Sequence, residues 1–231
     1  MSVGRLLLWR HGRTEFNATA RLQGQVDIPL DDVGRWQART AAAAMLARHT
    51  PTRIVSSDLD RARETAQALG RMAGVVVEVD ARVRERGFGE WEGLSGAEIA
   101  ERWPEDYALW RAGGEPTRVG AETRQVVARR TAEAITELSR AMSRDETLVV
   151  VSHGAAISSA VGELLGMPAA WRGMAGMHNA HWAEVVPSSG DVLPAWRLVA
   201  YNLGPTDAST DWNAGPDRAD DEQAGSTRDP D

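Results

Sequence analysis

Short apolar runs alternate with longer stretches of helical periodicity along most of the chain. Runs of this length, bounded by polar or turn residues, are typical of strands buried on both faces of a parallel sheet. Four such runs predict parallel strands at Leu6–Trp9, Thr52–Ser56, Val75–Val79 and Thr147–Ser152. Two later runs predict further strands at Trp182–Val186 and Ala195–Tyr201.

The stretches between these runs predict helices. The longer helices are expected over Gly34–His49, Leu59–Met72, Glu122–Met142 and Ala155–Leu165, and shorter ones around Ala97–Arg102 and Glu105–Arg111. In the longest of them, apolar and small side chains recur at helical spacing on one face, at Val127, Thr131, Ala134, Leu138 and Met142. Because strands alternate with helices, we predict an α/β fold, a three-layer α/β/α sandwich with a mostly parallel central sheet.

The regular alternation ends at Leu203, and the rest of the chain is rich in Gly, Pro, Asp and Ser. A segment of this composition cannot bury enough apolar surface to become ordered. We therefore expect one domain over residues 1–203 and an acidic disordered tail over residues 204–231. Of the net charge of −7, eight acidic residues and two arginines from Pro205 to Asp231 contribute −6. The remainder is nearly neutral, which argues against binding to nucleic acid.

Composition excludes several kinds of chemistry. The chain has no cysteine, so disulfides, thiolate catalysis and cysteine-bound zinc are excluded. All 26 basic residues are arginines, which rules out a Schiff-base lysine. Arginine binds phosphate or carboxylate better than lysine does, but genomic base composition is the better explanation of a chain that lacks lysine and is rich in alanine. No apolar run approaches the ~18 residues of a membrane helix, and the N-terminal run is too short for a signal peptide. We expect a cytoplasmic protein that does not bind membranes.

Two of the predicted parallel strands end in a histidine followed by a glycine. His11 follows the first strand and His153 the fourth, 142 positions later. Because the carboxyl ends of parallel strands lie at the same edge of a sheet, we expect the two imidazoles to meet. Gly154 opens a helix whose free N–H groups attract an anion. Arg10 lies at this edge, and Arg61 lies near the start of the helix that follows the second strand. Together with the two histidines, they predict a phosphate pocket.

Four motifs, in chain order, resemble those of the histidine phosphatase (phosphoglycerate mutase-like) superfamily. They are Arg10–Asn17 with Gln23-Gly24 and Asp27–Leu30, then Ser56–Ala66, Arg84–Gly93 and Val150–Gly154. The resemblance runs from about Arg5 to Tyr201 and implies the phosphoglycerate mutase-like fold. The chain departs from the family at Arg13, where an acidic or amide residue is usual. Arg13 is expected either at the mouth of the pocket or in solvent.

The resemblance implies a phosphomonoester hydrolase that works through a phosphohistidine. His11 would attack phosphorus, and Glu85 would protonate the leaving oxygen and then deprotonate a water. The residues expected to hold the phosphate are Arg10, Asn17, Arg61, His153 and Gly154. Further substrate contacts are expected at Arg13, Gln23 and Gly24. We expect neither a metal nor another cofactor, because arginines supply the positive charge and no carboxylate cluster joins His178 and His181.

Three functions stay open at this point. In the first, the protein is a phosphatase of a small phosphorylated metabolite. Three stretches resemble actinobacterial glucosyl-3-phosphoglycerate phosphatases, which implies a sugar or glycerate phosphate as substrate: Ile54–Leu59, Val75–Glu85 and Gly176–Trp182.

The second function is that of a cofactor-dependent phosphoglycerate mutase. Only 68 positions separate Glu85 from His153, which is short for the insertion that covers a mutase substrate. The third is a module that binds phosphorylated ligands without catalysis, and the intact His11 and Glu85 argue against it. The oligomeric state is also open, with a homodimer as one option.

Overall fold

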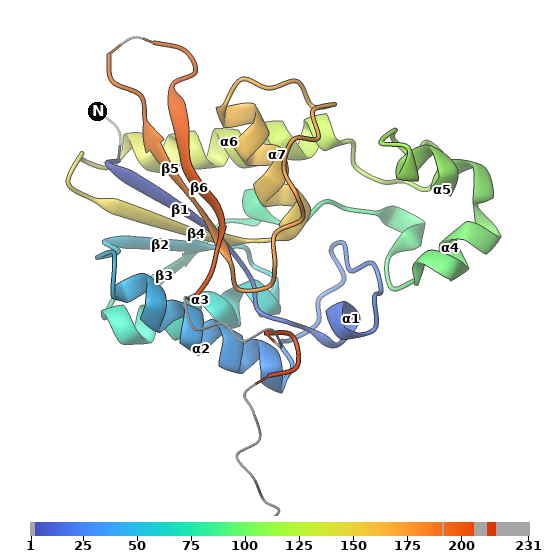
Figure 1. The fold of residues 1–231 in the computed structure, drawn as a ribbon, viewed down its shortest axis with the longest axis horizontal. Helices are drawn as coiled ribbons and strands as arrows, with labels where there is room; N and C mark the ends of the chain where they lie inside the picture. The colour runs from blue at the N-terminus through green and yellow to red at the C-terminus, as the bar shows by residue number, and fades with distance from the viewer. Residues whose placement is uncertain (1–2, 191, 206–211, 216–231) are drawn as a thin grey trace, which may run out of the picture.

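A six-stranded sheet forms the centre of the computed structural model, which describes residues 3–190, 192–205 and 212–215 (Figure 1). The strands are β1 (Arg5–Arg10), β2 (Arg53–Ser56), β3 (Val77–Val79), β4 (Thr147–Ser152), β5 (Trp182–Pro187) and β6 (Trp196–Leu203). Their order across the sheet is β3-β2-β4-β1-β5-β6. The first four are mutually parallel, and β5 runs antiparallel to both β1 and β6. The mostly parallel sheet is confirmed.

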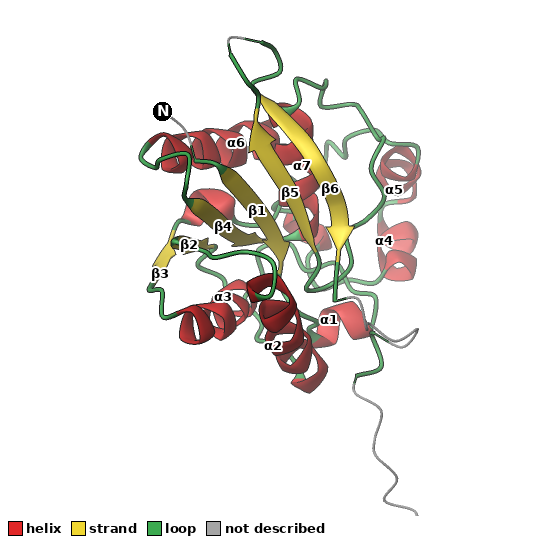
Figure 2. Cartoon of the chain, turned by 60° about the vertical axis from the view of Figure 1, so that its left-hand side comes forward, coloured by secondary structure: helices red, strands yellow, loops and turns green. Residues whose placement is uncertain are grey.

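Helices cover both faces of the sheet (Figures 1 and 2). On one face lie α2 (Asp32–Leu46) and α3 (Asp60–Ala73), and on the other α6 (Arg124–Arg140) and α7 (Gly154–Leu164). Successive side chains of a strand point to opposite faces, so Leu6 and Leu8 of β1 join the core under α6 and α7, whereas Leu7 joins the other core. The two cores make the three-layer α/β/α sandwich that the sequence predicts.

Most predicted elements begin and end within a few residues of the observed ones. The helix α2 starts two residues early because the Asp31 side chain caps it, accepting a hydrogen bond of 2.7 Å from the Gly34 N–H. The strand β3 starts at Val77 because the Val75 N–H still bonds to the Gly70 carbonyl at the end of α3. Local hydrogen bonds of this kind shift boundaries without changing the fold.

A separate small core lies beyond the carboxyl ends of the strands. It includes α4 (Gly96–Arg102) and α5 (Pro104–Arg111), which stand away from the sheet in Figure 1. Its buried members are Phe88, Trp91, Ile99 and Val119, and tryptophan and tyrosine side chains of α5 and the preceding loop pack on them. A one-turn helix, α1 (Glu15–Ala18), is an element that the sequence pattern does not predict.

The expected disordered tail falls mostly on residues outside the described part of the chain. Trp212–Gly215 are described, and here the structure differs from the expectation. Trp212 is only 6% exposed, packs on Trp36 with ring centroids 4.9 Å apart, and donates its Nε1–H to the Asn179 carbonyl at 2.8 Å. One large aromatic side chain thus buries enough surface to hold a segment of unfavourable composition. None of the helices in the described ranges is long and apolar enough to cross a membrane.

Candidate active site

The two histidines that follow β1 and β4 lie side by side at the carboxyl edge of the sheet. The register of the two strands pairs Arg10 with Ser152, so the next residue of each strand comes to the same level. The rings of His11 and His153 have centroids 5.1 Å apart, and the residues are 2% and 0% exposed. The rule for parallel strand ends therefore places them correctly.

The His11 ring is held in one tautomer. Its Nδ1 lies 2.7 Å from the Gly12 carbonyl oxygen. A carbonyl oxygen can only accept, so Nδ1 carries the proton and Nε2 keeps its lone pair. Burial, followed by the charges of Arg61 and Arg10, lowers the pKa of His11 well below the usual 6.5. The ring is therefore neutral at pH 7 and has the lone pair that a nucleophile needs.

Hydrogen bonds from neighbouring segments hold the backbone of His11 and Gly12 in place. The Gly12 N–H donates to the Thr65 hydroxyl at 3.1 Å. The Asn179 side-chain amide donates to the carbonyls of His11 and Gly12 at 3.2 and 3.3 Å. A Cβ at Gly12 would lie 2.3 Å from the Gly34 carbonyl oxygen, so only glycine fits there. These contacts join the catalytic loop to α2, α3 and the segment before β5.

A buried arginine, Arg61, and a half-buried one, Arg10, lie beside the histidine pair. Arg61, fully buried, donates from Nη1 to the Val26 carbonyl at 2.8 Å and from Nη2 to the Gly24 carbonyl at 2.7 Å. Arg10 donates from Nη1 to the Met177 carbonyl. In both side chains the Nε–H is buried and has no partner among the described residues. Burial lowers the pKa of Arg61 to about 10, so the group is still charged at pH 7.

Further buried polar atoms lack partners in the described part of the chain. Near the pocket these are both ring nitrogens of His153 and the Oε1 atom of Gln23; the others are the indole Nε1 atoms of Trp91 and Trp182. Leaving a polar group buried and unpaired costs about 1–3 kcal/mol, so such groups are uncommon outside sites that bind a ligand. Burial, with the charge of Arg61 adding to it, lowers the pKa of His153 well below 6.5. With the arginine Nε–H groups, the atoms of His153 and Gln23 form a cluster of unused hydrogen-bonding capacity.

Glu85 occupies the N-terminus of α7. Its Oε1 accepts from the N–H groups of Arg86 at 2.8 Å and Ala156 at 2.9 Å, and its Oε2 accepts from the Ala155 N–H at 3.1 Å. A carboxylate is favoured at a helix N-terminus by the helix dipole. Two of the N–H groups that the sequence analysis assigns to the phosphate are thus taken by Glu85. Its carbonyl in turn accepts from Arg130 at 2.8 Å, which fixes the loop.

A pocket of about 330 Å³ opens over these groups. Of the residues that the sequence analysis selects, those lining it are Arg10, His11, Asn17, Gln23, Gly24, Arg61, Glu85 and Gly154. His153 lies beside His11 at its base. The sequence analysis misses the other lining residues, which are Arg21, Leu22, Phe88, Ala155, Ser158, Gly176 and Met177. Ala155 and Ser158 lie on α7, and the others come from loops and from the small second core. Phe88, Gly176 and Met177 fall within stretches that carry the family resemblance, but nothing in the sequence marks them as lining a pocket.

Arg13 and His153 are the selected residues that are absent from the pocket lining, and for Arg13 the expected contact with substrate is not supported. Its Nε donates to Asp31 at 2.8 Å and its Nη1 to the Asn213 carbonyl. Its backbone N–H donates to Gln37 at 2.8 Å, and Gln37 in turn donates to the Trp212 carbonyl at 2.8 Å. Arg13 therefore joins the catalytic loop to α2 and to the Trp212 segment. Only the folded chain brings these partners together.

The histidines of the second pair, His178 and His181, also lie close together. The rings of His178 and His181 have centroids 5.3 Å apart. Nowhere in the described ranges do three or more His, Asp or Glu side chains come together as metal ligands would. His181 instead packs against Trp212, with ring centroids 5.6 Å apart.

Comparison with known proteins agrees with this geometry. The family model described as "Histidine phosphatase superfamily (branch 1)" matches residues 6–203. Two curated relatives named glucosyl-3-phosphoglycerate phosphatase, from Mycobacterium tuberculosis and Mycolicibacterium vanbaalenii, are 39% and 41% identical over 214 and 216 residues; each alignment covers 87% of this chain and 96% of the relative. A structure of a mycobacterial glucosyl-3-phosphoglycerate phosphatase with VO3 is 38% identical, with a TM-score of 0.77, and the match covers 87% of this chain and 99% of that one.

Proposed function

The chain belongs to branch 1 of the histidine phosphatase superfamily and is a phosphatase of small phosphorylated metabolites; we propose that it acts through a phosphohistidine on His11 and that its substrate is glucosyl-3-phosphoglycerate. The observation that carries the mechanism is the His11 tautomer, with Nδ1 committed to the Gly12 carbonyl and Nε2 free. The substrate is proposed from the names of relatives that match this chain over nearly its whole length.

In the first step, the His11 Nε2 lone pair attacks phosphorus. An N–P bond forms while the P–O bond to the leaving group breaks. Glu85, in its protonated form, gives its proton to the leaving oxygen. The Glu85 carboxyl group lies near enough to Arg10 and Arg61 to interact electrostatically with both, which supports its position at the edge of the phosphate site.

In the second step, water attacks the phosphohistidine. The N–P bond breaks, the electron pair returns to Nε2, and Glu85 accepts the proton of the water, so inorganic phosphate leaves and the enzyme is regenerated. The same carboxyl group thus serves as acid and then as base. Its anchoring at the N-terminus of α7 keeps it in one place for both steps.

The phosphate would be bound by groups that are already charged or unpaired. We assign this role to the guanidinium groups of Arg10 and Arg61, the His153 ring and the side-chain amide of Asn17. Asn17 uses its Oδ1 to accept from Thr14 and Asn179, which leaves its NH2 group for the ligand. Phosphoryl transfer depends chiefly on such positioning and charge stabilisation, and removal of one donor typically costs about 10²–10³ in turnover.

The cytoplasm is the location that we propose, because phosphorylated metabolites carry charges that do not cross lipid bilayers.

The decisive test combines turnover with chemical trapping. The full chain is given glucosyl-3-phosphoglycerate labelled in the phosphate, and phosphate release and acid-labile protein-bound label are measured after rapid denaturation. We expect both in the wild type and in His49→Ala, a control variant of a histidine in the loop after α2, and neither in His11→Ala. Label that persists in His11→Ala would overturn the phosphohistidine assignment. Release from other metabolites but not from this one would overturn the proposed substrate. Conversion of 3-phosphoglycerate to its isomer would favour a mutase.

A further inference from the structure

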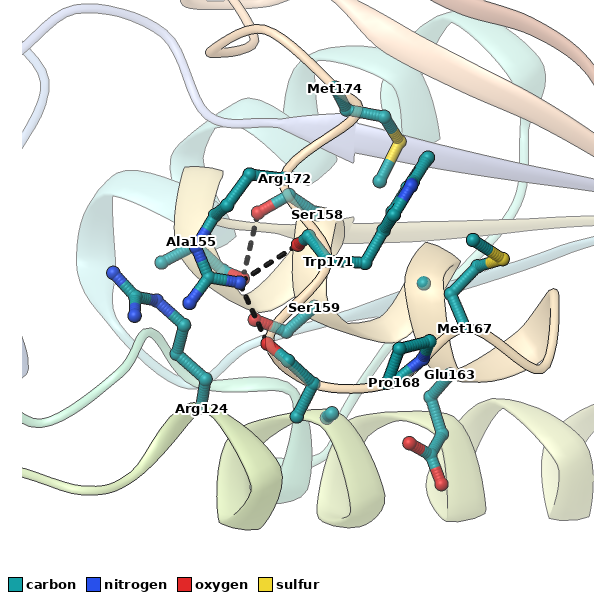
Figure 3. A pocket seen from close by; sticks show the side chains of 13 residues that line it. Arg124, Ala155, Ser158, Ser159, Glu163, Met167, Pro168, Trp171, Arg172 and Met174 are labelled. Atoms are coloured by element: carbon teal, nitrogen blue, oxygen red, sulfur yellow. Dashed lines mark hydrogen bonds between the residues drawn. The ribbon is translucent and has the colours of Figure 1, made fainter. Parts of the chain in front are cut away.

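A second cavity, of about 100 Å³, adjoins the phosphate pocket. The two share Ala155 and Ser158 on the first turns of α7. The second cavity continues along this helix to Gly162 and is closed by the start of α6 and by the loop that follows α7 (Figure 3). Together the two volumes fall in the range of small-molecule sites, about 300–1,000 Å³. A phosphorylated compound seated on His11 could therefore extend into this space.

One wall of the cavity is apolar and flat. The Trp171 indole lies next to Met174 in Figure 3, and Met167 lies further along the same side. The indole lies over Gly173, where a Cβ would come within 2.1 Å of the ring. The hydroxyls of Ser158 and Ser159 lie on the helix side. A flat aromatic face with hydroxyls nearby suits a sugar ring, which has apolar C–H faces and a polar rim.

The mouth of the cavity carries positive charge. Arg172 donates to the carbonyls of Ala169 and Trp171 at 2.7 and 2.8 Å, and the hydrogen bonds found for it within the described residues all go to carbonyl oxygens. Its neighbour Arg124 lies 3.3 Å from Glu115. Burial and the charge of Arg124 lower the pKa of Arg172. The Arg172 charge is thus available to an anion.

The acidic groups nearby are already engaged. Glu115 also pairs with Arg86 at 2.6 Å, so one carboxylate serves two arginines before Arg172 is considered. Glu163 lines the cavity, but its carboxylate turns toward α6 in Figure 3, where it accepts from Gln125 at 3.4 Å. A carboxylate of the substrate would therefore meet more positive than negative charge at this mouth.

We infer that this cavity is the leaving-group subsite, in which Trp171 binds the sugar ring and Arg172, with Arg124, binds the carboxylate of a glycosylated hydroxy acid. The inference rests on the proposed function. The length of α7 gives the distance from the phosphate pocket to the far end of the second cavity. At 1.5 Å per residue, the helix rises about 12 Å from Gly154 to Gly162. A phosphate at the first residue and a sugar ring one to two turns further on match a substrate in which a short acid links the two.

The test measures kcat/KM for matched pairs of phosphate esters. Glucosyl-3-phosphoglycerate against 3-phosphoglycerate gives the sugar preference, and 3-phosphoglycerate against glycerol 3-phosphate gives the carboxylate preference. We expect Trp171→Ala to lower the sugar preference about tenfold and Arg172→Gln to lower the carboxylate preference about tenfold, the usual size of one pocket contact. Trp171→Phe, which keeps an aromatic face, should retain most of the sugar preference. Arg140→Gln, an exposed arginine at the end of α6, should retain the carboxylate preference.

The outcomes separate the subsite from the proposed function. If the wild type prefers the glucosyl ester and Trp171→Ala keeps that preference, the subsite is wrong and the proposed substrate stands. If the wild type hydrolyses neither glycerate ester but hydrolyses other phosphates, the proposed substrate is wrong. The subsite is then judged by calorimetric binding of glucosylglycerate in the presence of inorganic phosphate. Binding that Trp171→Ala weakens supports the subsite, and absence of binding to the wild type overturns it. Thermal unfolding of every variant excludes misfolding as the cause.

Discussion

Thr65 provides a precise test of how the catalytic loop is held. Its hydroxyl accepts the Gly12 N–H at 3.1 Å and donates to the Arg61 carbonyl at 2.7 Å, and the residue is fully buried. Thr65→Val keeps the shape of the side chain and removes the hydroxyl. The Gly12 N–H is then left in the interior without an acceptor, directly beside His11.

The expected loss follows from opposing contributions. An unsatisfied buried N–H costs about 1–3 kcal/mol, while the added methyl contributes up to about 0.8 kcal/mol of hydrophobic stabilisation. The Arg61 carbonyl loses only a second donor, since it lies inside α3. We therefore expect the free energy of unfolding to fall by about 1–2 kcal/mol. Because small displacements of a reacting group lower the rate steeply, we expect kcat to fall about tenfold.

Urea unfolding and the rate of phosphate release at saturating substrate measure the two effects. Thr65→Ser is the matched control, because it keeps the oxygen and loses one methyl, at a cost of about 1 kcal/mol. It should be slightly less stable and nearly as active as the wild type. A valine variant with unchanged kcat would refute the positioning role. So would a serine variant that loses as much activity as the valine variant.

Burial lowers the pKa of both His11 and His153 in the folded protein. At pH values between that lowered pKa and 6.5, the unfolded chain binds more protons than the folded one, so the free energy of unfolding decreases as the pH falls below 6.5. Urea unfolding between pH 7.5 and 5.5 should show a slope of up to about 1.4 kcal/mol per pH unit for each ring, and His153→Asn should reduce it; equal slopes would contradict the assignment. Arg61→Met should lower kcat/KM about 10²–10³-fold in phosphate-release assays, and a change of less than threefold would remove Arg61 from the site. Trp212→Ala should lower the free energy of unfolding by no more than about 2 kcal/mol. Burial of a tryptophan side chain contributes about 3–5 kcal/mol, but the entropy cost of ordering its short segment offsets much of that. Urea unfolding measures the change, and a loss above about 4 kcal/mol would contradict this balance. Overnight dialysis against EDTA should leave phosphate release unchanged, since arginines supply the positive charge, and activity restored only by added metal would be contrary to the mechanism.

The sequence alone was sufficient to predict the sheet and its central pair of histidines. The apolar runs mark strands because a strand buried on both faces excludes polar residues. Parallel strands share one carboxyl edge, so His11 and His153 could be placed together without coordinates. Arg10 lies at the same edge and Arg61 near the start of the helix after the second strand, so both could be assigned to the pocket from their positions alone, and both line it.

Other features depend on contacts between segments that no local pattern connects. Glu85 was selected by its motif, but its hydrogen bonds to the N–H groups of α7 depend on how its loop packs against a helix 70 residues away. Arg13 was placed at the pocket mouth or in solvent, and instead it pairs with Asp31 and the Asn213 carbonyl. The composition around Trp212 indicates disorder, yet its ring finds a site between Trp36 and His181.

The difference between the features that the sequence predicts and those that it does not has a physical cause. Strand and helix periodicity, and the edge at which strands end, follow from backbone geometry and from the burial of apolar side chains, which neighbouring residues determine. The sequence by itself therefore determined the layers and the location of the chemistry. The direction of a long polar side chain and the docking of one aromatic ring depend on whichever partner the folded chain brings within reach. Only the tertiary structure decided what holds the catalytic loop and what shapes the space beside it.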